Sequence, residues 1–467
     1  MLYPVSDLMQ TLFYKSGKRA IYIKIFVEFP MTDKKNSDPR LVASSLIRVV
    51  LDQSLFLNEL LADLLSPFDY PKRRFITELV YGTIRNLTHL DFWISRVFKK
   101  PLKRINDNLL DLIRVSLYQI IFMSNREPAA IVFEAAELAK RCGNERTAGF
   151  VNYILREILR QDPTRGNMEK CFGGDYEAFL QTYYSIPAWL FVRLKRLAER
   201  LGDDIETLLQ IVNRPLGITL RVDGDESERE RVIESLRERG IEAEPARECR
   251  YAVYTHKAAN FSMISEFKNV SIQDESSQLA VCELGIEPGD RILDLCSAPG
   301  GKTLFASYLT GDTGRVTAAD VNANRLTMLT EAIVRNGKRN IEVKLQDGAS
   351  FNPDWQDKFD KVLLDAPCSA LGTIRRHPEI KWLKNNKDSA KMASISEKIL
   401  NNACKYVKTG GILVFSVCTF TREESIDQID RFIADHKNFE IEKSYYTVRE
   451  VTENRDIFYI CRMRRTK

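Results

Sequence analysis

Leu293-Asp-Leu-Cys-Ser-Ala-Pro-Gly-Gly-Lys-Thr303 is the stretch that decides the fold, because an apolar run leads into a glycine-rich turn and then into a helical pattern. Glycines in such a turn let the backbone approach a ligand, and the following helix offers unpaired N–H groups at its N-terminus. The loop is neither G-x-G-x-x-G nor a Walker loop, which argues against a dinucleotide or ATP. It predicts a different nucleotide-type ligand at the first strand-to-helix turn of an α/β domain.

The chain from Val270 onward alternates apolar strands with amphipathic helices. Strands are predicted over 291–295, 314–319, 341–345, 359–364, 411–417 and 457–463, and helices over 302–309, 325–336 and 389–407. Repeated βα units favour a mostly parallel, doubly wound sheet whose site lies at the carboxyl ends of the strands. We therefore predict a Rossmann-like α/β domain over residues 270–467.

Acidic residues follow successive strands of this predicted domain. Asp320 ends the second strand, where a carboxylate can bridge ribose hydroxyls, and Asp347 follows the third, placed to reach an adenine edge. Either residue alone could be an ordinary turn-forming aspartate. Together with the glycine loop, the two acids favour an adenosyl ligand.

Two cysteines also lie at strand ends. Cys368 follows the fourth strand, in Asp365-Ala-Pro-Cys368, and Cys418 follows the fifth, so both should face the same crevice. A buried cysteine is usually an inert small hydrophobe. At a strand end beside polar residues, in contrast, a thiolate can be stabilised.

A thiolate beside an adenosyl methyl donor points to methylation of a pyrimidine. Carbon 5 of cytosine is too weakly nucleophilic to take a methyl group directly, but attack of a thiolate at carbon 6 makes carbon 5 enamine-like. Methyl transfer, loss of the carbon 5 proton and elimination of the enzyme then follow. Asp365 is placed to hydrogen-bond the nitrogen edge of the ring, which must leave its stack to reach the site.

Arg375-Arg-His-Pro-Glu-Ile-Lys-Trp382 follows Cys368 and is rich in cations. Cations bind phosphates and an aromatic ring can stack on a displaced base. The predicted RNA-binding residues are Arg375, Arg376, His377 and Lys381.

The composition is that of an ordinary globular protein. A length of 467 residues predicts two to four domains, and a net charge of +5 permits nucleic-acid binding without requiring it. The nine cysteines include no C-x-x-C pair, so neither a disulfide framework nor a metal site is expected. We expect a monomer in the reducing cytoplasm.

The first 38 residues form an extension without visible chemistry. Ala20 to Phe29 alternates like an edge strand, but it is too short and too charged to span a bilayer and has no signal cleavage site. Alternatively, translation begins at Met31, which an intact mass that includes residues 1–30 would exclude. No membrane partner is expected.

Two further domains are predicted in front of the α/β domain. Residues 39–161 show helical periodicity and predict an all-α bundle, and the polar segment 162–174 reads as a linker. Residues 176–269 predict a helical stretch and then a small α+β unit of the ferredoxin-like or RNA-recognition type. This middle domain either binds RNA or only braces the catalytic domain.

The helical module resembles the NusB-type RNA-binding domain. The likeness rests on the order and spacing of Glu78-Leu-Val-Tyr-Gly-Thr-Ile-Arg85, Ile113-Arg-Val-Ser-Leu-Tyr-Gln-Ile-Ile-Phe-Met123 and Gly149-Phe-Val-Asn-Tyr-Ile-Leu-Arg156. It implies a basic surface that faces RNA. Taken singly, Arg85, Arg114 and Arg156 are as well explained as solvated or helix-capping residues.

The α/β domain resembles the RNA cytosine-5 methyltransferases of the NOL1/NOP2/Sun family. The glycine loop, Leu364-Asp-Ala-Pro-Cys-Ser-Ala370 and Phe415-Ser-Val-Cys-Thr-Phe420 carry the likeness, which starts at Ile272-Gln-Asp-Glu-Ser-Ser-Gln-Leu279. With the NusB-type module in front, the likeness to bacterial 16S ribosomal RNA methyltransferases of this family spans about residues 39–467. It implies methylation of carbon 5 of a cytosine in 16S ribosomal RNA.

The resemblance also implies roles for individual residues. Cys418 would be the nucleophile, Cys368 would assist product release and Asp365 would bind the base. The residues implied to hold S-adenosyl-L-methionine are Cys296, Ser297, Ala298, Pro299, Gly300, Gly301, Lys302, Asp320, Arg325, Asp347 and Asp365.

The chain departs from the family pattern at three points. Val417 stands where the family has threonine, Arg422-Glu-Glu-Ser425 replaces Pro-Glu-Glu-Asn, and Asp456-Ile-Phe-Tyr459 lacks the glycine often found after that aspartate. Two alternatives stay open at the level of sequence. One is a DNA cytosine-5 methyltransferase with Cys368 as the nucleophile, and the other is a non-catalytic ribosomal RNA-binding assembly factor.

Overall fold

The computed structural model describes residues 38–123, 126–255, 264, 266–448 and 454–467. The expectations for the segment 20–29 and for Met31 lie outside these residues. The chain forms two compact units. The first comprises Met1–Lys195 together with His377–Asn385, and the second comprises Arg196–Arg376 and Asn386–Lys467.

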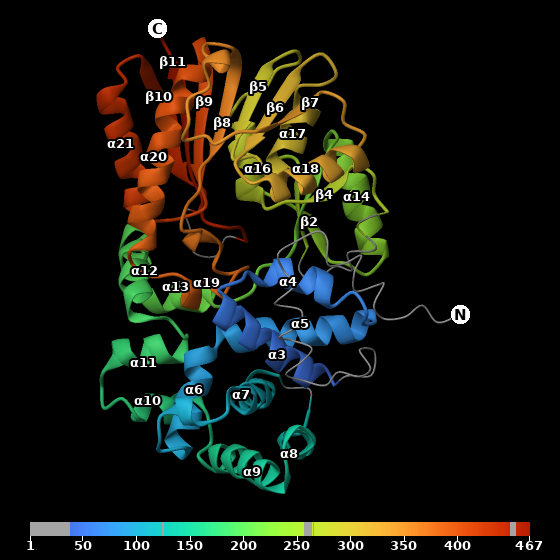
Figure 1. Ribbon diagram of the computed structural model, residues 1–467, viewed down its shortest axis with the longest axis vertical. Helices are drawn as coiled ribbons and strands as arrows, with labels where there is room; N and C mark the ends of the chain where they lie inside the picture. Colours follow the sequence, from blue (N-terminus) through green and yellow to red (C-terminus); the bar gives the residue numbers. More distant parts are fainter. Residues whose placement is uncertain (1–37, 124–125, 256–263, 265, 449–453) are drawn as a thin grey trace. The chain divides into compact units, whose positions relative to one another are not determined.

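The first unit is helical, as the periodicity predicts (Figure 1). Its helices start where the sequence supplies capping residues: Asp38, Asp69 and Asn106 each accept a hydrogen bond from a backbone N–H of the first helical turn. The helices are α3 (Pro39–Gln53), α4 (Leu57–Leu64), α5 (Tyr70–Arg85), α6 (Leu87–Val97), α7 (Asp107–Phe122), α8 (Pro128–Cys142), α9 (Glu145–Arg160), α10 (Arg165–Lys170), α11 (Tyr176–Tyr183) and α19 (Ile380–Leu383).

The segment 162–174, expected as a linker, contains the short helix α10. Its Met168 side chain is fully buried, so this part of the chain packs into the unit. A helix of this length is too short to show amphipathic periodicity in the sequence. The chain leaves the first unit within α12 (Ala188–Leu201), because the boundary falls after Lys195.

The second unit contains a small antiparallel sheet in the order β2-β3-β1-β4. Its elements are α13 (Ile205–Val212), β1 (Thr219–Val222), α14 (Glu226–Glu238), β2 (Ala243–Pro245), β3 (Ala252–Thr255) and β4 (Val270–Ile272). Strand β4, which we expected to begin the α/β domain, pairs with β1 and completes the small sheet. The small sheet and the α/β domain belong to the same compact unit.

The large sheet of this unit has seven strands in the order β10-β11-β9-β8-β5-β6-β7 (Figure 1). Strands β9, β8, β5, β6 and β7 are parallel neighbours, and β11 and β10 are antiparallel. This order confirms the predicted Rossmann-like fold. The strands are β5 (Arg291–Leu295), β6 (Arg315–Asp320), β7 (Ile341–Leu345), β8 (Phe359–Asp365), β9 (Val407–Val417), β10 (Phe439–Tyr446) and β11 (Tyr459–Arg465).

Helices cover both faces of the large sheet. Leu293, Leu364 and Phe415 pack on one face with α20 (Asp388–Tyr406) and α21 (Ile426–Asp435). Their neighbours in the strands, such as Leu363 and Val414, pack on the other face with α16 (Glu275–Cys282) and α17 (Gly301–Leu309). Helix α18 (Ala323–Arg335) packs against β6 and β7. Among the described residues, no helix combines the length and the apolar character that crossing a bilayer requires.

Candidate active site

The glycine loop lies between β5 and α17, as the sequence predicts. The backbone N–H of Ser297 donates to the carbonyl of Ala319 over 2.9 Å, which ties the loop to the end of β6. Gly300 has φ +112°, and a Cβ built there would lie 2.3 Å from Leu329 Cδ1. The loop therefore needs glycine at this position both for its backbone conformation and for its packing on α18.

Polar atoms in and before the loop fit a polar ligand. Within the described part of the chain, the buried Ser297 Oγ and Asp294 Oδ1 have no hydrogen-bond partner. Asp294 Oδ2 accepts a hydrogen bond from Thr303 Oγ1 over 2.6 Å. Burial raises the pKa of Asp294 to about 7. Because buried polar groups are normally paired, Ser297 Oγ in particular is suited to a ligand atom.

The predicted ribose-binding carboxylate lies next to this loop. Asp320 ends β6 and is almost fully buried. Its carboxylate accepts hydrogen bonds from the backbone N–H groups of Ala298 (3.2 Å) and Asn322 (2.9 Å). The guanidinium of Arg325 donates to the carbonyl of Ala298 and lies 4.0 Å from Asp320. Cys296, Pro299 and Gly301 belong to the same loop, so the structure brings most of the predicted adenosyl-binding residues together.

Asp347 lies beyond the end of β7 and is exposed to solvent. Its carboxylate accepts a hydrogen bond from the backbone N–H of Ala349 over 2.9 Å. The turn-forming role that any aspartate can play is therefore present here. Its predicted contact with an adenine edge stays a prediction.

Lys302, in the first turn of α17, forms an ion pair with Asp365 at the end of β8, with 2.6 Å between Nζ and Oδ2. The other carboxylate oxygen of Asp365 accepts a hydrogen bond from Ser416 Oγ over 2.8 Å. Burial acts to lower the pKa of Lys302, but the pairing with Asp365 outweighs it and the net shift is upward. The ammonium also lies 5.4 Å from the centre of the Phe458 ring. The ion pair and the ring contact thus hold the Lys302 ammonium in a largely buried position.

Cys368 and Cys418 meet at the ends of β8 and β9. Their sulfur atoms lie 3.2 Å apart, and both residues are half-buried. The backbone N–H of Gly372 donates to the carbonyl of Cys418 over 3.0 Å, and a Cβ on Gly372 would lie 1.9 Å from the carbonyl oxygen of Ile457. Val417, where the family has threonine, is buried and pairs with Tyr459 of β11. A thiol pair at the site edge of a parallel sheet can act on one bound ring.

The environment of Cys418 disfavours its thiolate. The contact with Cys368 and, next, burial raise its pKa well above the ordinary value, while the Lys302 ammonium acts in the opposite direction. The thiolate is the attacking species in cysteine chemistry. The proton on Cys418 therefore controls how fast this thiol can react.

We expect the rate of covalent attack by Cys418 to rise with pH. Below a raised pKa the thiolate fraction increases about tenfold per pH unit, so log rate should climb with a slope near 1 from about pH 6.5 to about pH 8.5. The measurement is single-turnover adduct formation with RNA that contains 5-azacytidine. In Cys368→Ala the main cause of the raised pKa is gone, so the profile should move to lower pH. A profile without pH dependence in either protein would contradict this view of Cys418.

Glu424 is a residue of this site that sequence reasoning missed. It lies in a short 3-10 helix, Arg422–Glu424, and its side chain is buried between the loops that follow the two cysteines. The signal in the sequence was the acidic motif Arg422-Glu-Glu-Ser425, to which we assigned no role.

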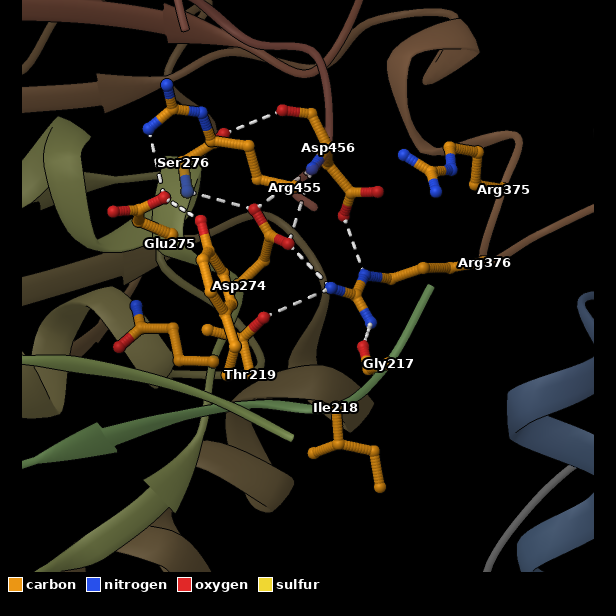
Figure 2. Close-up of polar contacts among 12 residues, drawn as sticks. Gly217, Ile218, Thr219, Asp274, Glu275, Ser276, Arg375, Arg376, Arg455 and Asp456 are labelled. Carbon is orange, nitrogen blue, oxygen red and sulfur yellow. Dashed lines mark hydrogen bonds and ion pairs between the residues drawn. The ribbon is translucent and has the colours of Figure 1, made fainter. Parts of the chain in front are cut away.

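Arg376, expected to bind RNA, is instead held inside the second unit (Figure 2). Its guanidinium pairs with Asp274 (2.6 Å) and Asp456 (3.1 Å) and donates to the carbonyl of Gly217 over 2.9 Å. Burial acts to lower the pKa of Arg376, but these carboxylates raise it. Arg376 lies in the loop between β8 and β9, and its side chain thus links this loop to the small sheet and to the segment before β11. Each nitrogen of the guanidinium has a partner within the protein, and the contact of Arg376 with phosphate stays a prediction.

Lys381 and His377 belong to the first unit. Lys381 is fully buried, and its ammonium donates to the carbonyls of Arg85 (2.9 Å) and Tyr184 (3.2 Å). Burial lowers its pKa well below the ordinary value. The ring of His377 packs edge-on against Phe56. Lys381 therefore packs inside this unit. Arg375 donates to the carbonyl of Arg214 over 3.3 Å, and the contacts of Arg375 and His377 with RNA stay predictions.

Of the three arginines singled out in the helical module, Arg85 and Arg114 are buried. Arg114 pairs with Asp91 and Asp111 at 2.7 to 2.8 Å. The exposed pair between Arg156 and Asn152, at 2.9 Å, is local to α9.

Three family models match the chain. Residues 281–459 match the 16S rRNA methyltransferase RsmB/F model, residues 37–160 match the NusB family, and residues 186–262 match the ferredoxin-like domain of the RsmF/B-like methyltransferases. The three matches follow one another along the chain in the order that the sequence predicts.

Whole proteins show the same likeness. The chain is 34% identical over 414 residues to the probable ribosomal RNA small subunit methyltransferase B of Bacillus subtilis, covering 87% of this chain and 90% of the relative. It is 32% identical to ribosomal RNA small subunit methyltransferase B of Proteus mirabilis, covering 91% and 98%.

Solved structures share the fold. The crystal structure of PH0851 covers 92% of this chain and is itself covered completely, with a TM-score of 0.73 at 22% identity. NSun6 from Pyrococcus horikoshii, solved with SFG, has a TM-score of 0.52 at 20% identity and covers 60% of this chain and 98% of its own. Because the relatives are 32% and 34% identical over most of its length, the chain belongs to the ribosomal RNA small subunit methyltransferase B family, whose cofactor is S-adenosyl-L-methionine.

Proposed function

We propose that the chain methylates carbon 5 of a cytosine in 16S ribosomal RNA through a covalent bond between Cys418 and carbon 6 of the ring. The observation that carries the proposal is the pair of sulfur atoms 3.2 Å apart at the ends of β8 and β9. The names of the relatives support ribosomal RNA as the substrate class. The chemistry of the thiol pair supports cytosine and carbon 5.

Each residue of the site has a separate role in this reaction. The Cys418 thiolate adds to carbon 6, and Asp365 hydrogen-bonds the nitrogen edge of the ring, where charge shifts as the bond forms. Lys302 orients Asp365 through their 2.6 Å ion pair. A base then takes the proton from carbon 5, the C–H electron pair restores the double bond between carbons 5 and 6, and the Cys418 thiolate leaves carbon 6. Cys368 lies close enough to Cys418 to exchange a proton with the departing sulfur.

S-adenosyl-L-methionine, when bound, supplies the methyl group that carbon 5 accepts. The residues suited to hold it are the loop 296–302, with the unpaired hydroxyl of Ser297, and the strand-end carboxylate of Asp320. Arg325 fixes the loop through the carbonyl of Ala298. Asp347 remains a candidate for the adenine edge.

An exposed basic segment in the first unit supports RNA as the partner. The basic segment Arg96-Val-Phe-Lys-Lys-Pro-Leu-Lys-Arg104 begins at the end of α6 and runs toward α7, and it holds five cations and no acid. Lys99, Lys100 and Lys103 are exposed, and no carboxylate of the described residues pairs with them. Unpaired cations grouped on one loop attract a phosphate backbone.

We expect replacement of Lys99, Lys100 and Lys103 by glutamine to weaken RNA binding and its salt dependence. Each lost phosphate contact lowers the slope of log affinity against log salt by about 0.7, so the slope should fall by about 2. Fluorescence anisotropy with a labelled RNA at several salt concentrations measures this. The control changes Arg126, Lys140 and Arg160 to glutamine, since each already pairs with a glutamate. An equal fall in both proteins would show a net-charge effect only.

The function itself is tested with labelled S-adenosyl-L-methionine and small-subunit ribosomal RNA from cells that lack the gene. Digestion to nucleosides and mass spectrometry should find the label in 5-methylcytidine, and bisulfite sequencing should locate one cytosine that loses its modification without the gene. Duplex DNA of the same sequence is the control substrate. Label in DNA but not in RNA, or in another nucleoside, or in neither, would overturn the proposal.

A further inference from the structure

The Glu424 carboxylate holds the loop that follows Cys368. The backbone N–H and the hydroxyl of Ser369 donate to the two carboxylate oxygens, each over 2.6 Å. Ser369 is the residue directly after Cys368 and is buried. A carboxylate that accepts two hydrogen bonds from one residue fixes both the position and the orientation of that residue.

The same carboxylate holds the loop that follows Cys418. The hydroxyl of Thr421 donates to Glu424 over 2.6 Å, and Thr419, directly after Cys418, approaches the same oxygen at 3.4 Å. The hydroxyls of Ser369 and Thr419 also lie 3.1 Å apart. Glu424 and these three hydroxyl residues form one buried cluster, which includes the residue after each cysteine.

The cluster depends on the two acceptor oxygens of the Glu424 side chain. Its partners among the described residues are backbone N–H and hydroxyl groups, all of them donors. A glutamine side chain offers one acceptor oxygen and an NH2 group that would face the same donors. The change Glu424→Gln therefore removes the link between the loops with almost no change in size.

We infer that Glu424 is a positioning residue that holds the two cysteine loops together and so keeps the two thiols within reach of one ring. The inference rests on the proposed function of the thiol pair. Glu424 is not itself placed against a substrate; it acts through Ser369 and Thr419. On the other side of Cys418, the hydrogen bond from Gly372 to its carbonyl supplies a separate restraint. Glu424 holds the two loops in place relative to each other, and the hydrogen bond from Gly372 holds the backbone of Cys418.

Disulfide formation measures this placement without RNA or cofactor. A thiolate of the pair attacks oxidised glutathione and releases one reduced glutathione, and the second thiolate then displaces another, so two thiols and one oxidised glutathione give one protein disulfide and two reduced glutathiones. The rate of the second step reports how closely the two sulfurs are held. Peptide mass spectrometry quantifies the Cys368–Cys418 linkage over time, at a temperature where each variant is folded.

The chain provides an internal control. Cys249 and Cys282 form a second thiol pair, with sulfurs 4.0 Å apart. Glu275, also fully buried, accepts a hydrogen bond from the backbone N–H of Cys249 over 2.9 Å. Glu275→Gln is thus a control change at a buried glutamate that lies against the other pair, and it also breaks the 2.9 Å ion pair of Glu275 with Arg455.

In Glu424→Gln we expect the second exchange step, which closes the Cys368–Cys418 disulfide, to slow at least about tenfold. Small misplacements of reacting groups have large effects on rate. The Cys249–Cys282 step should keep its wild-type rate. Glu275→Gln should leave the Cys368–Cys418 step unchanged. Glu424→Asp, which keeps both carboxyl oxygens on a shorter side chain, should recover part of the lost rate. For methylation, kcat should fall about a hundredfold in Glu424→Gln, with KM for RNA and cofactor unchanged.

Two outcomes would overturn the inference. Wild-type disulfide rates in Glu424→Gln would show that the loops do not need its carboxylate. Equal slowing of both disulfides in that variant would show a general loss of stability. If the wild-type protein failed to methylate RNA, the proposed function would fall, whereas the disulfide rates would still decide whether Glu424 positions the pair.

Discussion

Replacing Cys418 by alanine is expected to abolish both methyl transfer and the covalent adduct with RNA that contains 5-azacytidine. Removal of the attacking atom in a covalent mechanism lowers the rate by roughly 10⁴-fold or more, because the remaining groups cannot make carbon 5 nucleophilic. Denaturing gel electrophoresis with labelled RNA detects the adduct, and single-turnover transfer from labelled S-adenosyl-L-methionine gives the rate.

Cys368→Ala is the matched variant, since its sulfur lies 3.2 Å from that of Cys418. This protein should still form the adduct but release it slowly, so the adduct should accumulate even on unmodified RNA. If instead Cys368→Ala loses the adduct and Cys418→Ala keeps it, the roles are exchanged, as in a DNA-type cytosine-5 methyltransferase. Both variants remove one half-buried thiol, so their effects on folding should be similar.

Asp365→Asn is expected to lower kcat by about 10² to 10³, the usual effect of removing one group that stabilises developing charge. The ion pair with Lys302 is lost at the same time, which removes the main opposition to the burial that lowers the pKa of Lys302. The Asp365 carboxylate raises the pKa of Cys418 more than Lys302 lowers it, so removing the Asp365 charge should lower the pKa of Cys418. The pH profile of adduct formation in the variant should therefore move to lower pH.

The same strand offers the control. Asp360 lies near the other end of β8, pairs with Lys408 at 2.6 Å and accepts a hydrogen bond from the backbone N–H of Arg291. Asp360→Asn breaks a comparable ion pair far along the strand from Asp365, so kcat and the pH profile should stay close to wild type. Loss of activity in both variants would assign Asp365 a role in the stability of the sheet only.

The strands with apolar runs could be predicted from the sequence. Residues 291–295 were predicted as a strand and form β5 with the same bounds. Strand β10 was missed because five of its eight residues are exposed and its sequence, Phe-Glu-Ile-Glu-Lys-Ser-Tyr-Tyr, shows no apolar run. It is an edge strand of the sheet. Charged side chains on an edge strand prevent its pairing with another chain, so such a strand need not show an apolar pattern.

The site was predictable where chemistry follows from position in the chain. A glycine loop after β5 and residues after successive parallel strands must gather at one edge of the sheet. The partners of a cation cannot be inferred in this way. Arg376 follows the cysteine motif like a phosphate ligand, yet its carboxylates come from Asp274 and Asp456, far from it in the chain. Glu424 was missed for the same reason, since its role depends on Ser369.

The path of the chain through residues 377–385 has a consequence for dissecting the protein. This segment belongs to the first compact unit although it is encoded between two parts of the second, and Lys381 and Trp382 bind the carbonyls of Arg85 and Ile84 there. No single cut of the polypeptide can therefore release both units intact. A fragment that ends at Lys195 would lack those two partners, and the complementary fragment would expose a buried lysine. A gene rearrangement that moved only the residues up to Lys195 would therefore not transfer the whole helical module. It would also have to move residues 377–385, which are encoded within the catalytic half of the gene.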